Sequence, residues 1–157
     1  MTMLKSLFFL VLVPGMLIGY FPYIVSTTDS ELFEPGMLAY LAYPLWLIGG
    51  VSMLWCFWSF LINGKGTPAP IDPPKGLVAV GLYRFVRNPM YVAGILGLIG
   101  WMLWSPSLSL IVAPFVFFIA AHLFVTKYEE PTLKKKFGAA YADYFNRVPR
   151  WIPRLPK

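Results

Sequence analysis

Long runs of apolar residues, almost free of charge, decide what this chain can fold into. A helix needs about 20 apolar residues to cross the hydrocarbon core of a bilayer. Only 13% of the residues are charged, against roughly 25% in an ordinary soluble domain. We therefore expect an all-α integral membrane protein with one domain over residues 1–157, four transmembrane helices and a C-terminal amphipathic or interfacial helix. The expected spans are about 4–25, 37–62, 89–104 and 107–127.

The first run also permits a competing interpretation as a cleaved signal peptide, because Lys5 resembles the positive region that precedes such a peptide. The run is longer than the usual apolar part of a signal peptide and has no clear small-x-small cleavage site. We expect a retained span, interrupted by Pro14 and Gly15.

The segments between the runs have a different composition. Residues 26–36 form a polar, acidic loop, and residues 63–74 carry four prolines and two glycines, which exclude a helix or a central strand. The third run, 89–104, is short for a bilayer. We expect residues 77–86 to lie in the membrane interface and supply the missing length, as part of a single loop over 63–88.

The tail, residues 128–157, has the pattern of an amphipathic helix. Apolar side chains recur at spacings of three and four, and the charged side chains fall largely elsewhere. Such a helix lies on the membrane or folds back over the bundle. The apolar positions are Leu133, Phe137, Tyr141, Tyr144, Phe145 and Val148.

The charges predict an orientation. All 13 Lys and Arg residues lie near the N-terminus, in the 63–88 loop, or from the end of the fourth run onward, whereas residues 26–36 and 105–107 have none. Because Lys and Arg favour the cytoplasmic side, we expect both termini, the loop and the tail to face the cytoplasm, in an inner or plasma membrane. The net charge of +6 then favours anionic lipid headgroups over nucleic acid as a partner.

The chain has one cysteine, Cys56, and one histidine, His122. Cys56 has no partner for a disulfide within the chain. A single histidine cannot supply a zinc site of the usual multi-histidine or cysteine type. We therefore expect no metal site.

The stretch Lys75–Gly94, KGLVAVGLYRFVRNPMYVAG, is basic, punctuated by glycine, and runs directly into the third apolar run. Arg84 and Arg87 stand at the foot of the expected helix, Asn88 is expected to cap it, and Pro89 suits its first position. These polar groups suit a membrane interface, and beside two tyrosines they equally suit a polar ligand. Both interpretations stay open.

An acidic pair, Glu129 and Glu130, is expected to close the fourth span just before Pro131. The pair can simply favour the dipole of the tail helix, or it can offer a carboxylate to a cationic ligand. His122 lies seven residues before Glu129 and shares its helical face. It is either a hydrogen-bonded polar residue inside the bundle or part of a pocket lining.

Three glycines, Gly94, Gly97 and Gly100, recur every three residues along the third run. Small residues at such spacing let helices approach closely. The same residues would leave room for a flat ring. Residue types alone do not decide between these interpretations.

Two separated blocks resemble the isoprenylcysteine carboxyl methyltransferase family and the related phospholipid N-methyltransferases. The first reads Gly-x-Tyr-x-x-x-Arg-x-Pro-x-Tyr, and the second reads Glu-Glu-x-x-Leu-x-x-x-Phe-Gly-x-x-Tyr-x-x-Tyr. The likeness covers about residues 63–157. It implies a methyltransferase that takes S-adenosyl-L-methionine in a cytoplasm-facing pocket, made by the last spans and the tail, and a lipophilic methyl acceptor from the bilayer.

The resemblance also implies which residues form the site. A sulfonium cofactor arrives already activated, so methyl transfer needs positioning and exclusion of water more than acid–base assistance. A carboxylate of the Glu129–Glu130 pair would hold the charged end of the cofactor, and Arg87, His122 and Tyr141 are candidates for the substrate side. The remaining cofactor contacts would be Lys75, Gly76, Leu77, Val78, Tyr83, Asn88, Pro89, Met90 and Tyr91.

The chain departs from the family pattern at two positions: Asn88 stands where the family often has His, and Ala93 where it often has Gly. The eukaryotic enzymes also place an Arg shortly before the acidic pair, where this chain reads HLFVTKY. Sterol reductases, which bind a nicotinamide cofactor, carry a similar Arg-x-Pro-x-Tyr stretch. A membrane reductase and a non-catalytic membrane protein that keeps the fold therefore remain alternatives.

Overall fold

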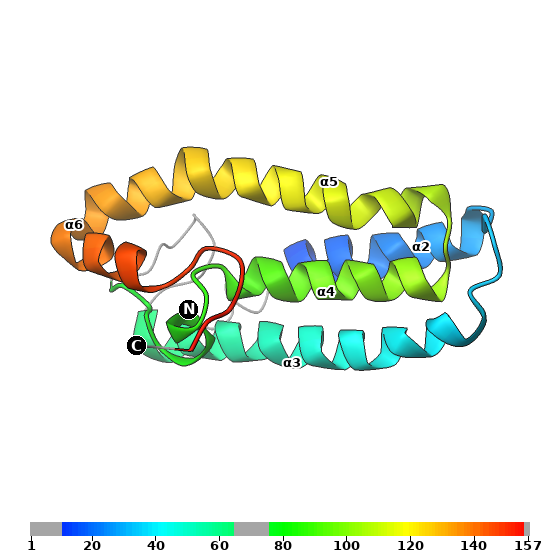
Figure 1. Cartoon of the computed structure of the whole chain (residues 1–157), viewed down its shortest axis with the longest axis horizontal. Helices are drawn as coiled ribbons and strands as arrows, with labels where there is room; N and C mark the ends of the chain where they lie inside the picture. Colours follow the sequence, from blue (N-terminus) through cyan, green and yellow to red (C-terminus); the bar gives the residue numbers. More distant parts are fainter. Residues whose placement is uncertain (1–10, 65–75, 156–157) are drawn as a thin grey trace.

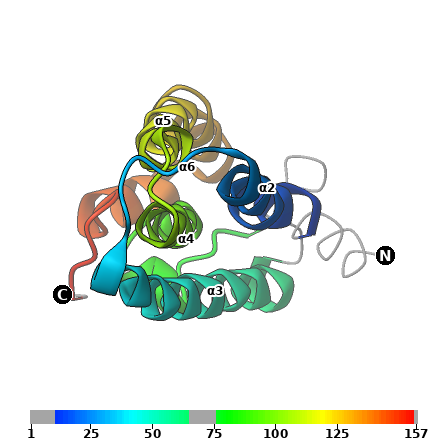
Figure 2. The same cartoon turned by 90° about the vertical axis from the view of Figure 1, so that its right-hand side faces the viewer.

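The computed structural model describes residues 11–64 and 76–155, and every regular element in those two stretches is a helix. The long helices run alongside one another (Figure 1). Viewed end-on, α4 lies at the centre, with α2, α3 and α5 around it (Figure 2). The prediction of an all-α chain is confirmed for the described residues.

The first long helix begins as a π-helix, η1, Val11–Tyr20, and continues as α2, Phe21–Thr28. Pro14 lies inside η1, where the wider π turns tolerate a residue that has no N–H to donate. Pro22 lies in the first turn of α2, where the chain passes from π-helical to α-helical turns. Residues 4–10 of the first predicted span lie outside the described residues.

The second predicted span is one continuous helical stretch, formed by η2, Gly36–Leu41, α3, Ala42–Ser59, and η3, Phe60–Gly64. The third helix, α4, runs from Pro89 to Trp104, with Pro89 in its first turn, and so has the predicted bounds.

The fourth helix begins next to residue 107, the predicted start of the fourth span. The Ser107 side chain accepts a hydrogen bond from the Leu110 N–H at 3.4 Å and caps α5, Leu108–Phe124. Ser, Thr, Asp and Asn favour such caps because their side-chain oxygen accepts a hydrogen bond from a free N–H of the first turn.

The chain stays helical past the acidic pair that is expected to close the fourth span just before Pro131. The helix continues from α5 through a π-helical turn, η5, Val125–Glu129, into α6, Glu130–Arg147. Pro131 lies in the first turn of α6, and the preceding π turn changes the hydrogen-bond register, so the proline interrupts nothing.

The direction of α6 changes at Gly138, whose φ of 52° and ψ of −124° are not helical. This conformation is open to glycine and strained for other residues. The later part of α6 therefore folds back over the bundle toward the start of α4 (Figure 1). Tyr141 and Tyr144 are buried there, so the amphipathic face predicted for the tail covers the bundle.

The glycines of α4 serve close packing, which decides between their two interpretations. A Cβ on Gly97 would lie 2.5 Å from Ile18 Cγ2, and a Cβ on Gly100 would lie 2.5 Å from Trp46 Nε1. Trp46 Nε1 also donates a hydrogen bond to the Gly97 carbonyl at 3.1 Å. Side chains of the neighbouring helices thus occupy the space that these glycines leave free.

Two helices of the described part are long and apolar enough to cross a membrane, namely Gly36–Asn63 and Leu108–Arg147. The helices Leu12–Thr28 and Pro89–Trp104 are apolar and shorter. The chain is therefore a membrane protein by composition and helix length. Four complete spans stay a prediction.

Candidate functional site

A cavity of about 530 Å³ lies between the first helix, α4, α5 and the folded-back tail. Most of its lining is apolar, with a small group of polar side chains from the start of α4 and from η5 and α6. Pockets for small ligands and cofactors commonly have this size and this composition.

The structure brings most of the predicted site residues to this one cavity, although their binding role stays a prediction. Pro89 is buried in the first turn of α4 and does not line the cavity, and Lys75 lies outside the described residues. The predicted residues that line it are Gly76, Leu77, Val78, Tyr83, Arg87, Asn88, Met90, Tyr91, Glu129, Glu130 and Tyr141.

The segment before α4 is held by packing on the end of α3. Val78, Tyr83 and Cys56 form a buried cluster. Gly81, with a φ of 57°, turns the chain into the short helix η4, Gly81–Arg84; a Cβ there would lie 2.9 Å from Trp55 Nε1. Only glycine fits both the conformation and the space, so this turn fixes where Tyr83 lies.

Glu129 is a partly buried carboxylate on the cavity wall. Its Oε1 accepts a hydrogen bond from the Tyr91 hydroxyl at 2.9 Å. No Lys, Arg or His side chain among the described residues forms an ion pair with it. A carboxylate withdrawn from water without a counter-ion favours a cationic partner.

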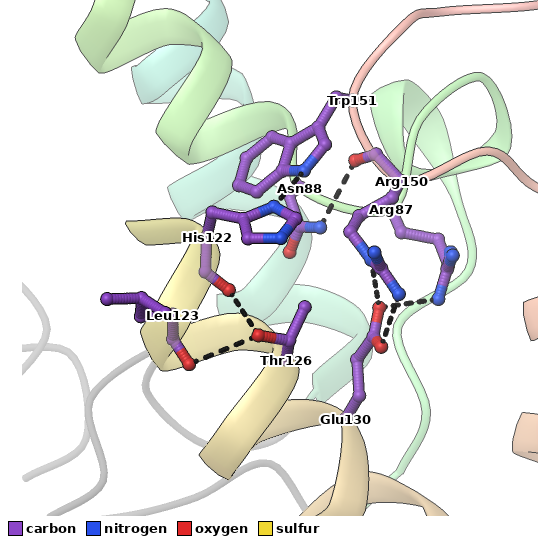
Figure 3. Close-up of polar contacts among 8 residues, drawn as sticks. All are labelled: Arg87, Asn88, His122, Leu123, Thr126, Glu130, Arg150 and Trp151. Carbon is purple, nitrogen blue, oxygen red and sulfur yellow. Dashed lines mark hydrogen bonds and ion pairs between the residues drawn. The ribbon is translucent and has the colours of Figure 1, made fainter. Parts of the chain in front are cut away.

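Glu130 has the opposite surroundings. Arg87 Nη1 lies 2.7 Å from Glu130 Oε1, and Arg150 binds both oxygens, from Nε at 2.7 Å and from Nη2 at 2.9 Å (Figure 3). These hydrogen bonds raise the pKa of Arg150, which stays charged. Two guanidinium groups therefore already occupy the Glu130 carboxylate.

Arg87 joins this ion-pair cluster to the cavity. Its side chain is 9% exposed, and its guanidinium carbon lies 3.9 Å from the centroid of the Phe145 ring. The Nε atom is buried and has no hydrogen-bond partner among the described residues. A buried N–H left unpaired is costly, so it marks a place where a ligand acceptor would be stabilised.

The chain after α6 runs back along the start of α4. Arg87 N donates to the Pro149 carbonyl at 2.8 Å, and Arg154 N donates to the Phe85 carbonyl at 3.0 Å. We call residues 148–154 the strap. The strap lies beside the start of α4 and brings Arg150 to Glu130 (Figure 3), and none of residues 148–154 lines the cavity.

The expected cap by Asn88 is wrong in its detail. Asn88 occupies the N-cap position of α4, but its side chain makes no capping hydrogen bond. Its Nδ2 instead donates to the Arg150 carbonyl of the strap at 3.1 Å (Figure 3). The strap offers an acceptor that competes with the helix end for this amide, and Pro89 already removes one free N–H there.

His122 contacts the strap and lies outside the cavity lining. Its Nδ1 accepts a hydrogen bond from Trp151 Nε1 at 3.1 Å, and the two rings lie close together (Figure 3). The geometry matches the first interpretation, a hydrogen-bonded residue inside the bundle. Its assignment to the substrate side stays a prediction that no contact supports.

Sequence reasoning missed three parts of the site. The sequence assigns no role to Arg150, which binds Glu130. The Tyr144 hydroxyl donates to the Tyr83 carbonyl at 2.8 Å and so joins α6 to η4. The first helix supplies cavity residues too, among them Leu17 and Ile18. Long-range contacts of this kind leave no local signal in a sequence.

Fold and site together define a helical membrane protein with a large cavity that is apolar for most of its surface and carries a group of polar side chains. A family model described as phospholipid methyltransferase matches residues 37–140, more than half of the chain. The chain therefore belongs to the phospholipid methyltransferase family. No solved structure gives a significant match.

Several curated proteins are similar to this chain. The nickel-cobalt-cadmium resistance protein NccN of Alcaligenes xylosoxydans xylosoxydans is 29% identical over 105 residues, which cover 67% of this chain and 45% of NccN. The protein-S-isoprenylcysteine O-methyltransferase of Schizosaccharomyces pombe is 31% identical over 87 residues, 51% of this chain and 34% of that protein. Protein-S-isoprenylcysteine O-methyltransferase B of Arabidopsis thaliana is 35% identical over 84 residues, 49% and 39% of the two chains.

The matches cover less than half of the length of each of these relatives. Among the described residues no group of three or more His, Cys, Asp or Glu side chains is arranged to hold a metal ion. The prediction that the protein has no metal site stays a prediction.

Proposed function

We propose that this protein transfers a methyl group from S-adenosyl-L-methionine to a lipophilic acceptor, and that the cofactor binds at the polar end of the cavity. The observation that carries the proposal is a pair of polar groups that are unmatched among the described residues: the Glu129 carboxylate has no cation there, and the Arg87 Nε has no acceptor. Family membership and the two O-methyltransferase relatives support the same reaction.

The residues present fit such a cofactor. Glu129 would pair with its ammonium group, and Arg87 and the Asn88 amide would face its carboxylate. The rings of Tyr83 and Tyr91 line the cavity and can stabilise a cation through their faces. The cavity volume lies within the range of cofactor pockets.

When bound, the cofactor supplies an activated methyl group, so the protein needs no metal and no strong base. Its residues orient two ligands and exclude water. Glu130 and the two arginines hold the strap beside the start of α4, and aromatic side chains of α4 and α5 line the cavity. We infer that a water-soluble cofactor comes from the cytoplasmic side and that the acceptor enters from the bilayer.

This function also implies an arrangement in the membrane. We infer that all four long helices span it, with both termini, the site and the basic tail at the cytoplasmic face, next to anionic headgroups. Because α4 is short for a membrane span, we infer that residues 77–86 before it lie in the interface and supply the missing length.

A radiochemical assay tests the reaction. Membranes that contain the protein are incubated with methyl-labelled S-adenosyl-L-methionine, and the label is counted in the lipid extract and in lipid-modified proteins. We expect label in one of these fractions and its loss in Glu129→Gln. Asp143→Asn, which changes an exposed carboxylate of α6, should keep the activity. Equal labelling of membranes with and without the protein would contradict the proposal.

A further inference from the structure

The cavity is polar at one end only. Arg87, Asn88 and Glu129 lie at the polar end, whereas the first helix and α5 contribute apolar side chains. Apolar lining residues on the first helix, α3 and α5 include Val13, Leu17, Ile18, Met53, Phe117 and Phe124. A ligand that fills the whole cavity must therefore have a polar group and an apolar tail.

Two side chains close the apolar part against the glycines of α4. A Cβ on Gly94 would lie 3.1 Å from Ile18 Cδ1 and 3.2 Å from Phe117 Cζ, and a Cβ on Gly97 would lie 2.5 Å from Ile18 Cγ2. Ile18 and Phe117 thus rest directly on the bare backbone of α4. These side chains fill the groove that the glycines form along α4, from Gly94 toward Gly97.

The position of Ile18 is fixed by its backbone. The Ile18 carbonyl accepts a hydrogen bond from Trp101 Nε1 at 2.8 Å. This bond joins the first helix to α4 beyond Gly97 and prevents the helix from sliding along α4. The side chain of Ile18 packs against Gly94 and Gly97. It can therefore move aside only by changing its rotamer in a closely packed place.

We infer that Ile18 limits the length of the apolar tail that the acceptor can have. This inference rests on the proposed function, because it takes the cavity as the place where the acceptor tail lies. The tail runs from Tyr91 along α4 and stops where Ile18 and Phe117 meet Gly94. Ile18 is therefore a specificity-determining residue for the length of the tail.

Two substitutions shorten this side chain by known amounts. Ile18→Val removes one carbon and Ile18→Ala removes three, so they should admit about one and about three further methylene groups. A rise of ~1.5 Å per residue puts Gly97 about 4.5 Å beyond Gly94, which is the space that Ile18→Ala opens. Met16→Ala is the matched control, since Met16 lies on the same helix, is exposed and does not line the cavity.

The test uses a series of straight-chain alcohols of increasing length, each with a photoreactive diazirine at its terminal carbon. The full chain in detergent is irradiated with each probe, without cofactor, and the labelled peptides are quantified by mass spectrometry. We expect the unmodified protein to be labelled near Ile18 or Phe117, with a sharp decline above one chain length. That limit should move by about one carbon in Ile18→Val and by about three in Ile18→Ala, and stay in place in Met16→Ala.

An unchanged length limit in both Ile18 variants would overturn the inference, and so would labelling confined to peptides outside the cavity. Should Ile18→Ala fail to fold, Ile18→Val still gives the shift or its absence. Calorimetry of the same variants with S-adenosylhomocysteine separates the two proposals. If the variants bind this nucleoside but the length limit does not shift, only the inference about Ile18 is wrong. If neither the unmodified protein nor the variants bind it, the methyltransferase proposal is wrong.

Discussion

Glu129 and Glu130 are adjacent in sequence, but their carboxylates meet different partners. Glu129 accepts a hydrogen bond from a tyrosine hydroxyl and has no cation beside it among the described residues, while Glu130 is held by Arg87 and Arg150. At this scale one carboxylate is available to a ligand and the other maintains the structure. Substitutions by glutamine separate the two roles, because glutamine keeps the size and removes the charge.

For Glu129→Gln we expect a weaker complex with S-adenosylhomocysteine and an unchanged fold, since glutamine can still accept the Tyr91 hydrogen bond. A hydrogen bond to a charged group contributes about 1.5–3 kcal/mol, so the dissociation constant should rise about 10- to 100-fold. Calorimetry measures the affinity, and Asp143→Asn is the control. An affinity that Glu129→Gln leaves intact would remove this residue from the cofactor site.

For Glu130→Gln we expect a loss of stability. Arg87 is 9% exposed and would keep its charge without a carboxylate partner. Breaking a buried pair from one side costs about 3 kcal/mol, and the fall should appear in the thermal unfolding of the detergent-solubilised protein. Arg150→Gln should cost less, because the Arg150 side chain is 29% exposed. Unfolding temperatures equal to that of the unmodified protein would argue against this role.

At the scale of elements, two adjacent glycines of α3 make a natural comparison. A Cβ on Gly49 would lie 2.9 Å from the backbone oxygen of Ala93, whereas a Cβ on Gly50 would meet nothing within 4 Å. Backbone cannot move aside as a side chain can, so Gly49→Ala should force α3 and α4 apart and cost about 1–3 kcal/mol. Gly50→Ala should be neutral or slightly stabilising.

Thermal unfolding of the two variants, followed by circular dichroism, checks this expectation. The comparison is controlled internally, because both substitutions add the same methyl group to the same helix. Equal unfolding temperatures for Gly49→Ala and Gly50→Ala would contradict the close packing of α3 on α4 at Gly49 and Ala93.

At the scale of the whole molecule, the helices were predictable because apolar runs bounded by Pro and Ser give a local signal. The bounds of α4 follow from Pro89 and from Ser105 after Trp104. The continuity past Pro131 was not predictable, since it depends on a π turn that no residue type announces. The unequal roles of the two glutamates were hidden too, because Arg150 reaches Glu130 only through the reversal at Gly138 and the strap.

The orientation in the membrane is a further prediction at this scale. Ser30 lies in the loop between α2 and η2, and Lys135 lies on α6; both are exposed. In sealed right-side-out vesicles, a membrane-impermeant maleimide should label Ser30→Cys and spare Lys135→Cys, and inverted vesicles should give the reverse. The native Cys56 is fully buried and serves as an internal blank. Labelling of both positions from the same side would contradict the four-span arrangement.

We propose that the cavity between the first helix, α4, α5 and the tail holds a sulfonium nucleoside at its polar end. Calorimetry of the purified protein with S-adenosylhomocysteine, and in parallel with a reduced nicotinamide nucleotide, measures this binding. We predict saturable binding of the first at one site per chain and no heat from the second. Binding of the nicotinamide nucleotide alone would indicate a reductase, and binding of neither would indicate a scaffold without this activity; either result would contradict the account.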